Sequence, residues 1–343
     1  MRRRTFLGSS LALGAAAAGG GLAAACAPTS PSSGLGSTLG PPETTTIRIA
    51  PVFCDPALWM AGDYLKEEGF TEVHLVPPSL NSLGAVPKGE ADVGILYSQQ
   101  IITNVDAGIP IVALAGLHTG CGEVWTRPGI SSIGELKGKT IAVRSVDAVN
   151  DAWYSFWAAM LGNIGIDPRK DVNFVEASSP LDTFLDGRSD AILVLALEVP
   201  LLRASPKNTG SVLINTLEDA PWRQYYCCQL IANRDWARRY PVATKRVTRA
   251  LLRANDLVTK DPAAAASAGV AQGMVAAASY DFERAVLKNS SHEWRDIDPA
   301  STLLFFAAQL AGQKLIKGGP QQLVTQASGF DLSELKRQYP RAN

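Results

Sequence analysis

The sequence predicts an α/β protein with two lobes, in which parallel-rich sheets are flanked by helices and the C-terminal part is helical. Three observations predict this class. Short apolar, β-branched runs alternate with helical patterns, this alternation occurs in two successive cycles, and the pattern turns helical after one late strand near residue 225. Strands that alternate with helices favour parallel sheets that are covered on both faces.

The first cycle begins with a strand predicted at residues 45–52. Asp55 and Pro56 then fit the N-cap and the first position of a helix, and Gly69 fits the position after its end. The rest of this cycle comprises strands at 73–77, 91–97 and 109–118, with a helix at 98–108.

The second cycle has the same alternation. We expect strands within 134–145 and at 171–178 and 189–197, and helices at 148–165, 179–187 and 198–205. A strand at 225–234 follows.

Two helical segments dominate the C-terminal part. In residues 241–262 an apolar stripe is predicted, formed by Val247, Leu251, Ala254 and Val258. Basic residues elsewhere on this helix form a solvated face or a partner contact: Lys245, Arg246, Arg249 and Arg253. Residues 299–319 are apolar nearly all round, which predicts a buried helix.

The N-terminus resembles an export signal, because a basic start leads into a weakly apolar Gly/Ala-rich run that ends at Cys26. Arg3 and Arg4 belong to a twin-arginine-like motif. The run "LAAAC" resembles a lipobox, although Leu22 lies one position further from Cys26 than in the commonest form. We therefore expect residues 1–26 to be a lipoprotein signal and Cys26 to carry the lipid; a plain secretory signal is the alternative.

Residues 27–45 are rich in Ser, Pro and Gly and predict a flexible tether. The chain has 32 basic and 32 acidic residues and no basic block, which argues against a nucleic-acid partner. After the signal, no apolar run reaches the roughly 18 residues of a spanning helix. We expect an exported body anchored by lipid on the cell-surface or periplasmic side of the cytoplasmic membrane.

Two crossings between the lobes divide the body. We predict lobe 1 at residues 46–118 plus 228–343 and lobe 2 at 119–227. Ligands of such sheets bind in the crevice at the carboxyl ends of strands, so the space between the lobes is the candidate site.

A family resemblance spans roughly residues 46–330. Its segments include "GEADVGIL", "AGIPIVALAGLH", "ELKGKTIAV", "LGNIGIDPRKDVNFVEA" and "ANRDWARRYPVATKRVTRALLRANDLVTKDP", in this order. The chain resembles the solute-binding proteins of ABC importers of the nitrate, sulfonate and taurine type, a group that includes binders of thiamine-pyrimidine precursors. The resemblance implies a type II-like periplasmic-binding-protein clamshell. Such a monomeric protein, with no cofactor and no enzymatic activity, closes on a sulfonate, carboxylate or pyrimidine-like solute and delivers it to a permease.

The resemblance also implies that the ligand contacts follow the strands. These positions are Cys54, Asp55, Ser98, His118, Thr119, Cys121, Ser145, Asp147 and Glu198. Backbone N–H groups at helix N-termini suit an anion, but Asp55 would repel one unless Arg144 turns into the cleft. Among the aromatic residues we expect Trp59, Trp222 and Tyr225 near the ligand, with core packing as the alternative.

The cysteines of the body cluster at predicted strand ends or crossovers: Cys54, Cys121, Cys227 and Cys228. Buried thiols, a disulfide such as Cys54–Cys121, and a soft-metal site all remain open. Neighbours in a strand point to opposite faces, so without a bulge only one of the adjacent pair lines the cleft, and we expect this to be Cys227.

We predict no metal in the binder. The alternative functions are a metal-binding or redox lipoprotein and an iron-dependent enzyme that resembles the eukaryotic pyrimidine synthases. A metal would use Cys54, His118, Cys121 and Cys227. The ligand itself cannot be read from the sequence.

Overall fold

The computed structural model describes residues 39–52, 55–77, 82–120, 122–195, 198–288 and 290–340. They belong to one compact unit, Gly34–Asn343. The predicted signal and most of the predicted tether lie outside the described residues. No helix in the described ranges is long and apolar enough to cross a membrane.

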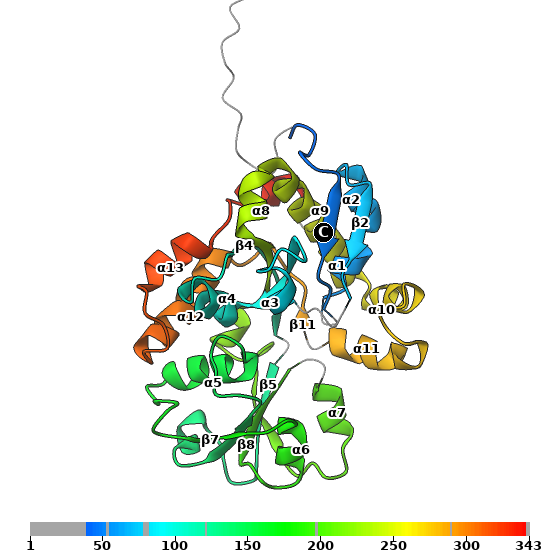
Figure 1. The fold of residues 1–343 in the computed structure, drawn as a ribbon. Helices are drawn as coiled ribbons and strands as arrows, with labels where there is room; N and C mark the ends of the chain where they lie inside the picture. Colours follow the sequence, from blue (N-terminus) through cyan, green and yellow to red (C-terminus); the bar gives the residue numbers. More distant parts are fainter. Residues whose placement is uncertain are drawn as a thin grey trace, which may run out of the picture. The chain divides into compact units, whose positions relative to one another are not determined.

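Two mixed β-sheets organise this unit, and we call each sheet with its flanking helices a lobe (Figure 1). The sheet of lobe 1 has the strand order β11-β4-β10-β3-β1-β2. Its strands are β1 (Thr46–Ile49), β2 (Glu72–Leu75), β3 (Val93–Tyr97), β4 (Ile111–Gly120), β10 (Tyr226–Asn233) and β11 (Ser290–Ser291). β1 pairs in parallel with β2 and β3, whereas β10 pairs antiparallel with both β3 and β4.

The sheet of lobe 2 has the order β7-β6-β8-β5-β9. Its strands are β5 (Gly122–Thr126), β6 (Thr140–Val143), β7 (Asn173–Glu176), β8 (Ala191–Leu195) and β9 (Ser211–Asn215). β6 pairs in parallel with β7 and β8, and β5 pairs antiparallel with β8 and β9. In both sheets every antiparallel pair described above therefore includes a strand next to a crossing between the lobes, namely β4, β5, β9 or β10.

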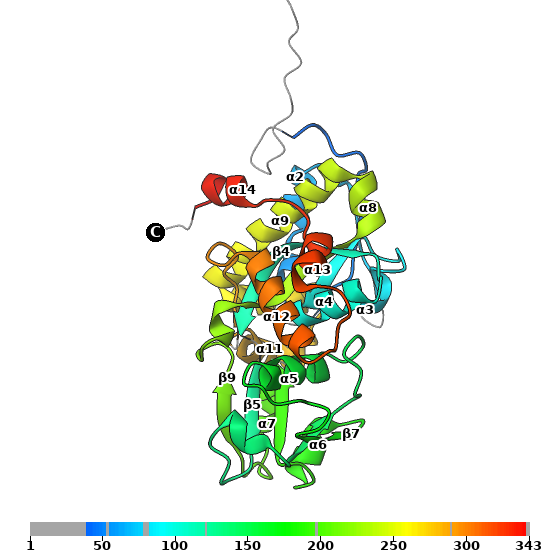
Figure 2. The ribbon, with the colours of Figure 1, turned by 90° about the vertical axis from the view of Figure 1, so that its left-hand side faces the viewer.

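Helices flank the sheets. Before β10 they are α1 (Ala57–Met60), α2 (Gly62–Glu67), α3 (Ser82–Ala85), α4 (Ser98–Asp106), η1 (Ile133–Leu136), α5 (Ala152–Gly162), α6 (Pro180–Leu185), α7 (Val199–Ala204) and η2 (Trp222–Gln224). After β10 they are α8 (Arg234–Arg239), α9 (Pro241–Lys260), α10 (Pro262–Ala271), η3 (Ala277–Ser279), α11 (Tyr280–Leu287), α12 (Pro299–Gly312), α13 (Pro320–Ala327) and α14 (Ser333–Gln338). α4 and α12 of lobe 1 pack on α5 of lobe 2 (Figure 2).

The predicted two-lobed α/β class is confirmed, with corrections in detail. The sheets are mixed rather than parallel-rich, because β10 and β11 pair antiparallel in lobe 1, and in lobe 2 the strands β5 and β9, which were not predicted, also pair antiparallel. The helix expected from Asp55 to Gly69 divides at Ala61. Pro56, not Asp55, is its N-cap residue, and no side chain caps it. The lobe boundaries stay a prediction; the sheets change over between Gly120 and Gly122 and again before Tyr226.

The helical C-terminal part is also confirmed. The four residues of the stripe on α9 are fully buried. α12 is less buried than predicted: it ends at Gly312, and Leu304 is 38% exposed. The basic side of α9 is mostly paired, because Arg246 and Arg249 bind Glu68, and Arg253 binds Glu67.

β10 lies in the middle of the lobe 1 sheet and all eight of its residues are buried. Its first residue, Tyr226, lies over Gly116 of β4, where an added Cβ would come within 2.1 Å of the ring. The ring is fully buried and its hydroxyl donates to the carbonyl oxygen of Ile297 at 3.1 Å. Glycine at this position therefore makes room for the returning strand.

We predict that Gly116→Ala lowers the free energy of unfolding by about 3 kcal/mol, because the buried ring has no space to retreat. Urea denaturation monitored by tryptophan fluorescence would measure it. Gly122→Ala on β5 is the matched control, because its nearest neighbours would be at 3.5 Å, an ordinary contact distance. Equal effects of the two substitutions would contradict the packing argument.

Candidate functional site

A cavity of about 240 Å³ lies between the two lobes. It is bordered by the carboxyl ends of β3 and β6, by the segment that follows β1, and by the start of α5. Its described lining residues are Val52, Ser82, Leu83, Ile95, Leu96, Tyr97, Gln100 and Cys228 from lobe 1, and Arg144, Asn150, Ala152 and Trp153 from lobe 2. This is the place where open α/β sheets bind ligands.

Arg144 and Trp153 supply the chemistry of the lobe 2 wall. The Arg144 guanidinium lies over the indole of Trp153, 4.1 Å from the ring centroid. Glu198 stands behind this pair: its Oε2 accepts the indole N–H of Trp153 at 3.2 Å, and its Oε1 lies 3.7 Å from Arg144. The carboxylate therefore orients the aromatic ring and shares the charge of the arginine.

The protonation of Glu198 reflects its burial. Burial raises the pKa of this carboxyl, against the opposing effects of the backbone N–H of Leu195, the charge of Arg144 and the indole of Trp153. Glu198 thus lies close to a cation, but its charged form is destabilised because burial removes its hydration. It does not line the cavity; its effect on a ligand passes through Arg144 and Trp153.

Ser145 and Asp147 shape the loop between β6 and α5 rather than the cavity wall. The N–H of Ser145 donates to Oδ2 of Asp151 at 2.8 Å. Asp147 accepts from the backbone of Val149 and from both the backbone and the side chain of Asn150, and the side-chain bond is the main reason that its pKa is lowered. These bonds place Asn150 at the cavity.

Polar side chains of α4 hold this loop against lobe 1. Thr103 donates to the carbonyl oxygen of Ala148 at 2.9 Å, and Asn104 donates to that of Val149 at 3.2 Å. Gln99 donates to the carbonyl oxygen of Ala152 at 3.3 Å. Three hydrogen bonds therefore link the lobes beside the cavity.

Ser98, which we predicted as a ligand contact, is fully buried behind the cavity. Its hydroxyl donates to the carbonyl oxygen of Tyr226 at 2.7 Å and accepts from the amide of Gln229 at 3.1 Å. These two bonds connect the start of α4 to β10, which gives Ser98 a structural role.

Asp55 and His118 come together in the core of lobe 1. Oδ2 of Asp55 lies 3.5 Å from Nε2 of His118, and both side chains are fully buried. The His118 ring lies 5.0 Å from that of His292, whose Nδ1 is 3.1 Å from the Asn255 side-chain oxygen. None of these residues lines the cavity between the lobes.

Only two of the four residues predicted for the metal alternative, His118 and Cys227, are among the described residues. Cys54 and Cys121 lie outside the described residues. Among the residues that the structure describes, no three His, Cys, Asp or Glu side chains form a group that could hold a metal ion. Thr119 lines a different cavity, of about 630 Å³, together with three carboxylates.

The two adjacent cysteines differ in state. Cys227 is in a disulfide, and Cys228 is a buried thiol. β10 shifts register on both sides of Cys228, and the two sulfurs are 4.0 Å apart. This irregularity removes the strict alternation on which our expectation rested. Cys228, rather than Cys227, lines the cavity.

The predicted aromatic residues pack in cores. Trp59 is buried on α1, and Trp222 packs against Phe156 and Phe305. Tyr225 stacks on Phe305 with centroids 3.9 Å apart. Tyr97 and Gln100 were not predicted from the sequence. Both lie at the junction of a strand and a helix, which is the position from which the other site residues were predicted.

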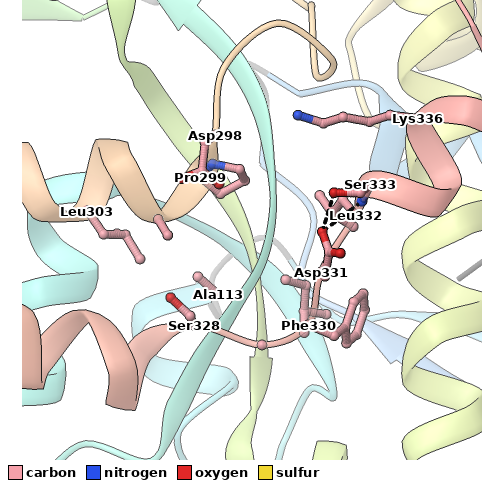
Figure 3. A pocket seen from close by; sticks show the side chains of 13 residues that line it. Ala113, Asp298, Pro299, Leu303, Ser328, Phe330, Asp331, Leu332, Ser333 and Lys336 are labelled. Carbon is pink, nitrogen blue, oxygen red and sulfur yellow. Dashed lines mark hydrogen bonds between the residues drawn. The ribbon is translucent and has the colours of Figure 1, made fainter. Parts of the chain in front are cut away.

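Another cavity, of about 290 Å³, lies in lobe 1 beside Ala113 of β4 (Figure 3). The start of α12 and the segment from Ser328 to Lys336 form its other walls, and Asp331 there accepts from Ser333. None of the predicted site residues lines it. The cavity between the lobes therefore remains the candidate site.

Two α/β lobes with a ligand-sized cavity between them define the periplasmic binding protein fold. Solved structures share it. The alkanesulfonate-binding protein SsuA from Xanthomonas axonopodis pv. citri, bound to MOPS, matches with a TM-score of 0.63 at 17% identity, covering 84% of this chain and 99% of its own. The nitrate-binding protein NrtA from Synechocystis PCC 6803 has a TM-score of 0.63 at 12% identity, with 87% and 89% covered.

A Candida albicans gene product described as having the generic periplasmic binding protein fold matches with a TM-score of 0.62 at 14% identity, covering 83% of this chain and 96% of its own. No curated protein sequence matches. The NMT1/THI5-like family model matches residues 60–265, more than half of the chain. The chain belongs to the NMT1/THI5-like family.

The buried histidine predicts a pH dependence of stability. Burial, and then the charge of His118, lower the pKa of His292 well below 6.5. Below about pH 6.5 the unfolded chain therefore binds a proton that the folded chain does not, so the free energy of unfolding falls as the pH falls, by up to about 1.4 kcal/mol per pH unit.

Urea denaturation between about pH 7 and pH 5, where model carboxylates stay charged, would measure this slope. We expect His292→Gln to flatten it. His74→Gln is the control, because the His74 side chain is 60% exposed. If the His292 variant keeps the slope of the unmodified protein, the buried neutral histidine is not its source.

Proposed function

We propose that the chain is the substrate-binding component of an ABC importer, which captures a small organic solute between its lobes and delivers it to a membrane permease. The observation that carries this proposal is the 240 Å³ cavity whose walls come from both lobes. A ligand that touches both walls favours the closed arrangement over the open one, which is how hinged binding proteins respond to a solute.

Arg144 and Trp153 indicate the class of solute. A guanidinium recognises a sulfonate or carboxylate through paired hydrogen bonds, and the indole offers a flat surface for a pyrimidine-like ring. Glu198 shares the charge of Arg144, which favours one negative charge on the ligand over two. The two transport-related structures above bind an alkanesulfonate and nitrate, which are also oxoanions.

The basic start, the Gly/Ala-rich run and Cys26 support export through a twin-arginine-like signal and attachment to the membrane by lipid. The alkanesulfonate-binding and nitrate-binding structures named above are binding proteins, which supports a binder without catalytic activity. That the protein is monomeric and needs no cofactor is part of the proposal.

We predict that Arg144→Gln weakens the affinity for an anionic solute by about 10- to 100-fold, since a charged hydrogen-bond donor is lost. Glu198→Gln should instead strengthen it, because Arg144 loses a competing carboxylate. Isothermal titration with a panel of alkanesulfonates, carboxylates and pyrimidines would measure both.

The matched control is Arg169→Gln, an arginine of lobe 2 that does not line the cavity and binds Asp167 at 3.3 Å. If Arg169→Gln weakens binding as much as Arg144→Gln, the loss of affinity comes from the lower positive charge of the protein and not from a direct contact between Arg144 and the solute. If solutes of the panel bind and Arg144→Gln does not change their affinity, the solute binds at another place.

We predict that Cys26→Ser moves the protein from the membrane fraction to the soluble exported fraction, because the thiol that accepts the lipid is gone. Fractionation of expressing cells followed by mass spectrometry of the N-terminus would show it. Cys228→Ser, which leaves the signal intact, should stay in the membrane fraction. A Cys26→Ser protein that stays membrane-bound would contradict lipid attachment at this residue.

A further inference from the structure

A separate cavity of about 460 Å³ lies on lobe 1, away from the cavity between the lobes. α8, the first turns of α9, β4 and the segment after α13 surround it. None of its lining residues is shared with the cavity between the lobes.

The charged lining of this cavity is entirely basic. Arg234, Arg238 and Lys245 line it, and no Asp or Glu does among the described residues. The pKa of Arg234 is lowered by burial and then by the charge of Arg238, so two like charges are held near each other here. An anion between them would relieve this repulsion.

Two polar atoms at the cavity are buried without a hydrogen-bond partner among the described residues. They are Nε of Arg234, whose Nη2 donates to the carbonyl oxygen of Ile111 at 3.0 Å, and the hydroxyl oxygen of Ser328. Both groups donate hydrogen bonds, and buried donors without partners are costly. Because both atoms are buried in the wall, an acceptor-rich ligand in the cavity would bind mainly to the charged ends of the lining cations.

The remaining walls are largely apolar. Leu114 of β4 and Phe330 contribute to them. The segment from Ser328 to Phe330 separates this cavity from the one in Figure 3, so Asp331 and Asp298 line that other cavity instead. A site with cations on one side and apolar side chains on the other suits an anionic group on an apolar body.

Helices α8 and α9, which border the cavity, lie at the end of lobe 1 where the described chain begins (Figures 1 and 2). Glu43 accepts from the N–H groups of Val242 and Ala243 at 2.9 and 2.8 Å, and Arg246 donates to the carbonyl oxygen of Leu39 at 2.9 Å. These contacts are on the same turns of α9 as Lys245. If Cys26 carries a lipid, as proposed above, the membrane to which the chain is attached lies within reach of the intervening tether.

We propose that this cavity binds the phosphate of an anionic phospholipid, which orients the tethered body on the membrane. The inference rests on the proposed lipid attachment for its biological setting, but the binding itself can be measured without it. The phosphate is held by Arg238, Lys245 and Arg234, and the glycerol and upper acyl carbons lie against Leu114 and Phe330.

The experiment uses the Cys26→Ser protein and vesicles of phosphatidylcholine with or without an equal part of phosphatidylglycerol. Co-sedimentation should show binding only when phosphatidylglycerol is present, and binding should weaken as salt is raised. We expect Arg238→Gln and Lys245→Gln each to reduce the partition coefficient about fivefold. Arg239→Gln is the matched control, because this exposed neighbour on α8 does not line the cavity.

Each outcome decides one point. Equal losses from Arg238→Gln and Arg239→Gln would mean general surface attraction and overturn the site. Equal affinity for soluble glycerol phosphate, measured by thermal shift, would overturn the lipid assignment. If the Cys26→Ser protein binds solute but does not bind vesicles with phosphatidylglycerol, this inference alone is contradicted; if it binds these vesicles but no solute of the panel, the proposed function alone is contradicted. Unchanged melting temperatures would confirm that the variants fold.

Discussion

The structure depends on the insertion of β10 between β3 and β4. This strand returns from lobe 2 and pairs antiparallel with both neighbours, so it closes the lobe 1 sheet that earlier residues leave incomplete. Tyr226 enters over Gly116, and Ser98 at the start of α4 bonds to the first residues of the strand. The cavity wall, the disulfide cysteine and the connection between lobes all follow from this placement.

The two lobes contribute unlike surfaces to the cavity. Lobe 1 supplies mainly apolar residues, together with Tyr97 and the single side-chain amide of Gln100, whereas lobe 2 supplies Arg144 stacked on Trp153. The hydrogen bonds from α4 to the loop before α5 hold these surfaces together at one side. A solute therefore contacts a charged and aromatic surface on lobe 2 and a mainly apolar surface on lobe 1. Because it needs both surfaces, its affinity depends on closure of the two lobes.

The site predictions show which kinds of residue the sequence could identify. Residues after strands were expected at the crevice, and Arg144 was recognised as a candidate cation there. Ser98 and Asp55 also follow strands, yet their side chains turn into the core, towards Tyr226 and His118. The position after a strand predicts where the backbone lies; the direction of the side chain depends on partners far away in the chain.

The sequence alone determined the α/β class, the two lobes, the buried stripe of α9 and the family, because these follow from periodicity and from the order of local motifs. Only the tertiary structure decided that the sheets are mixed, that Cys228 rather than Cys227 lines the cavity between the lobes, and that three cations line the separate 460 Å³ cavity of lobe 1. Each of these depends on contacts between segments that are far apart in the chain or on a local shift in strand register. Local sequence patterns predict neither distant contacts nor shifts of register.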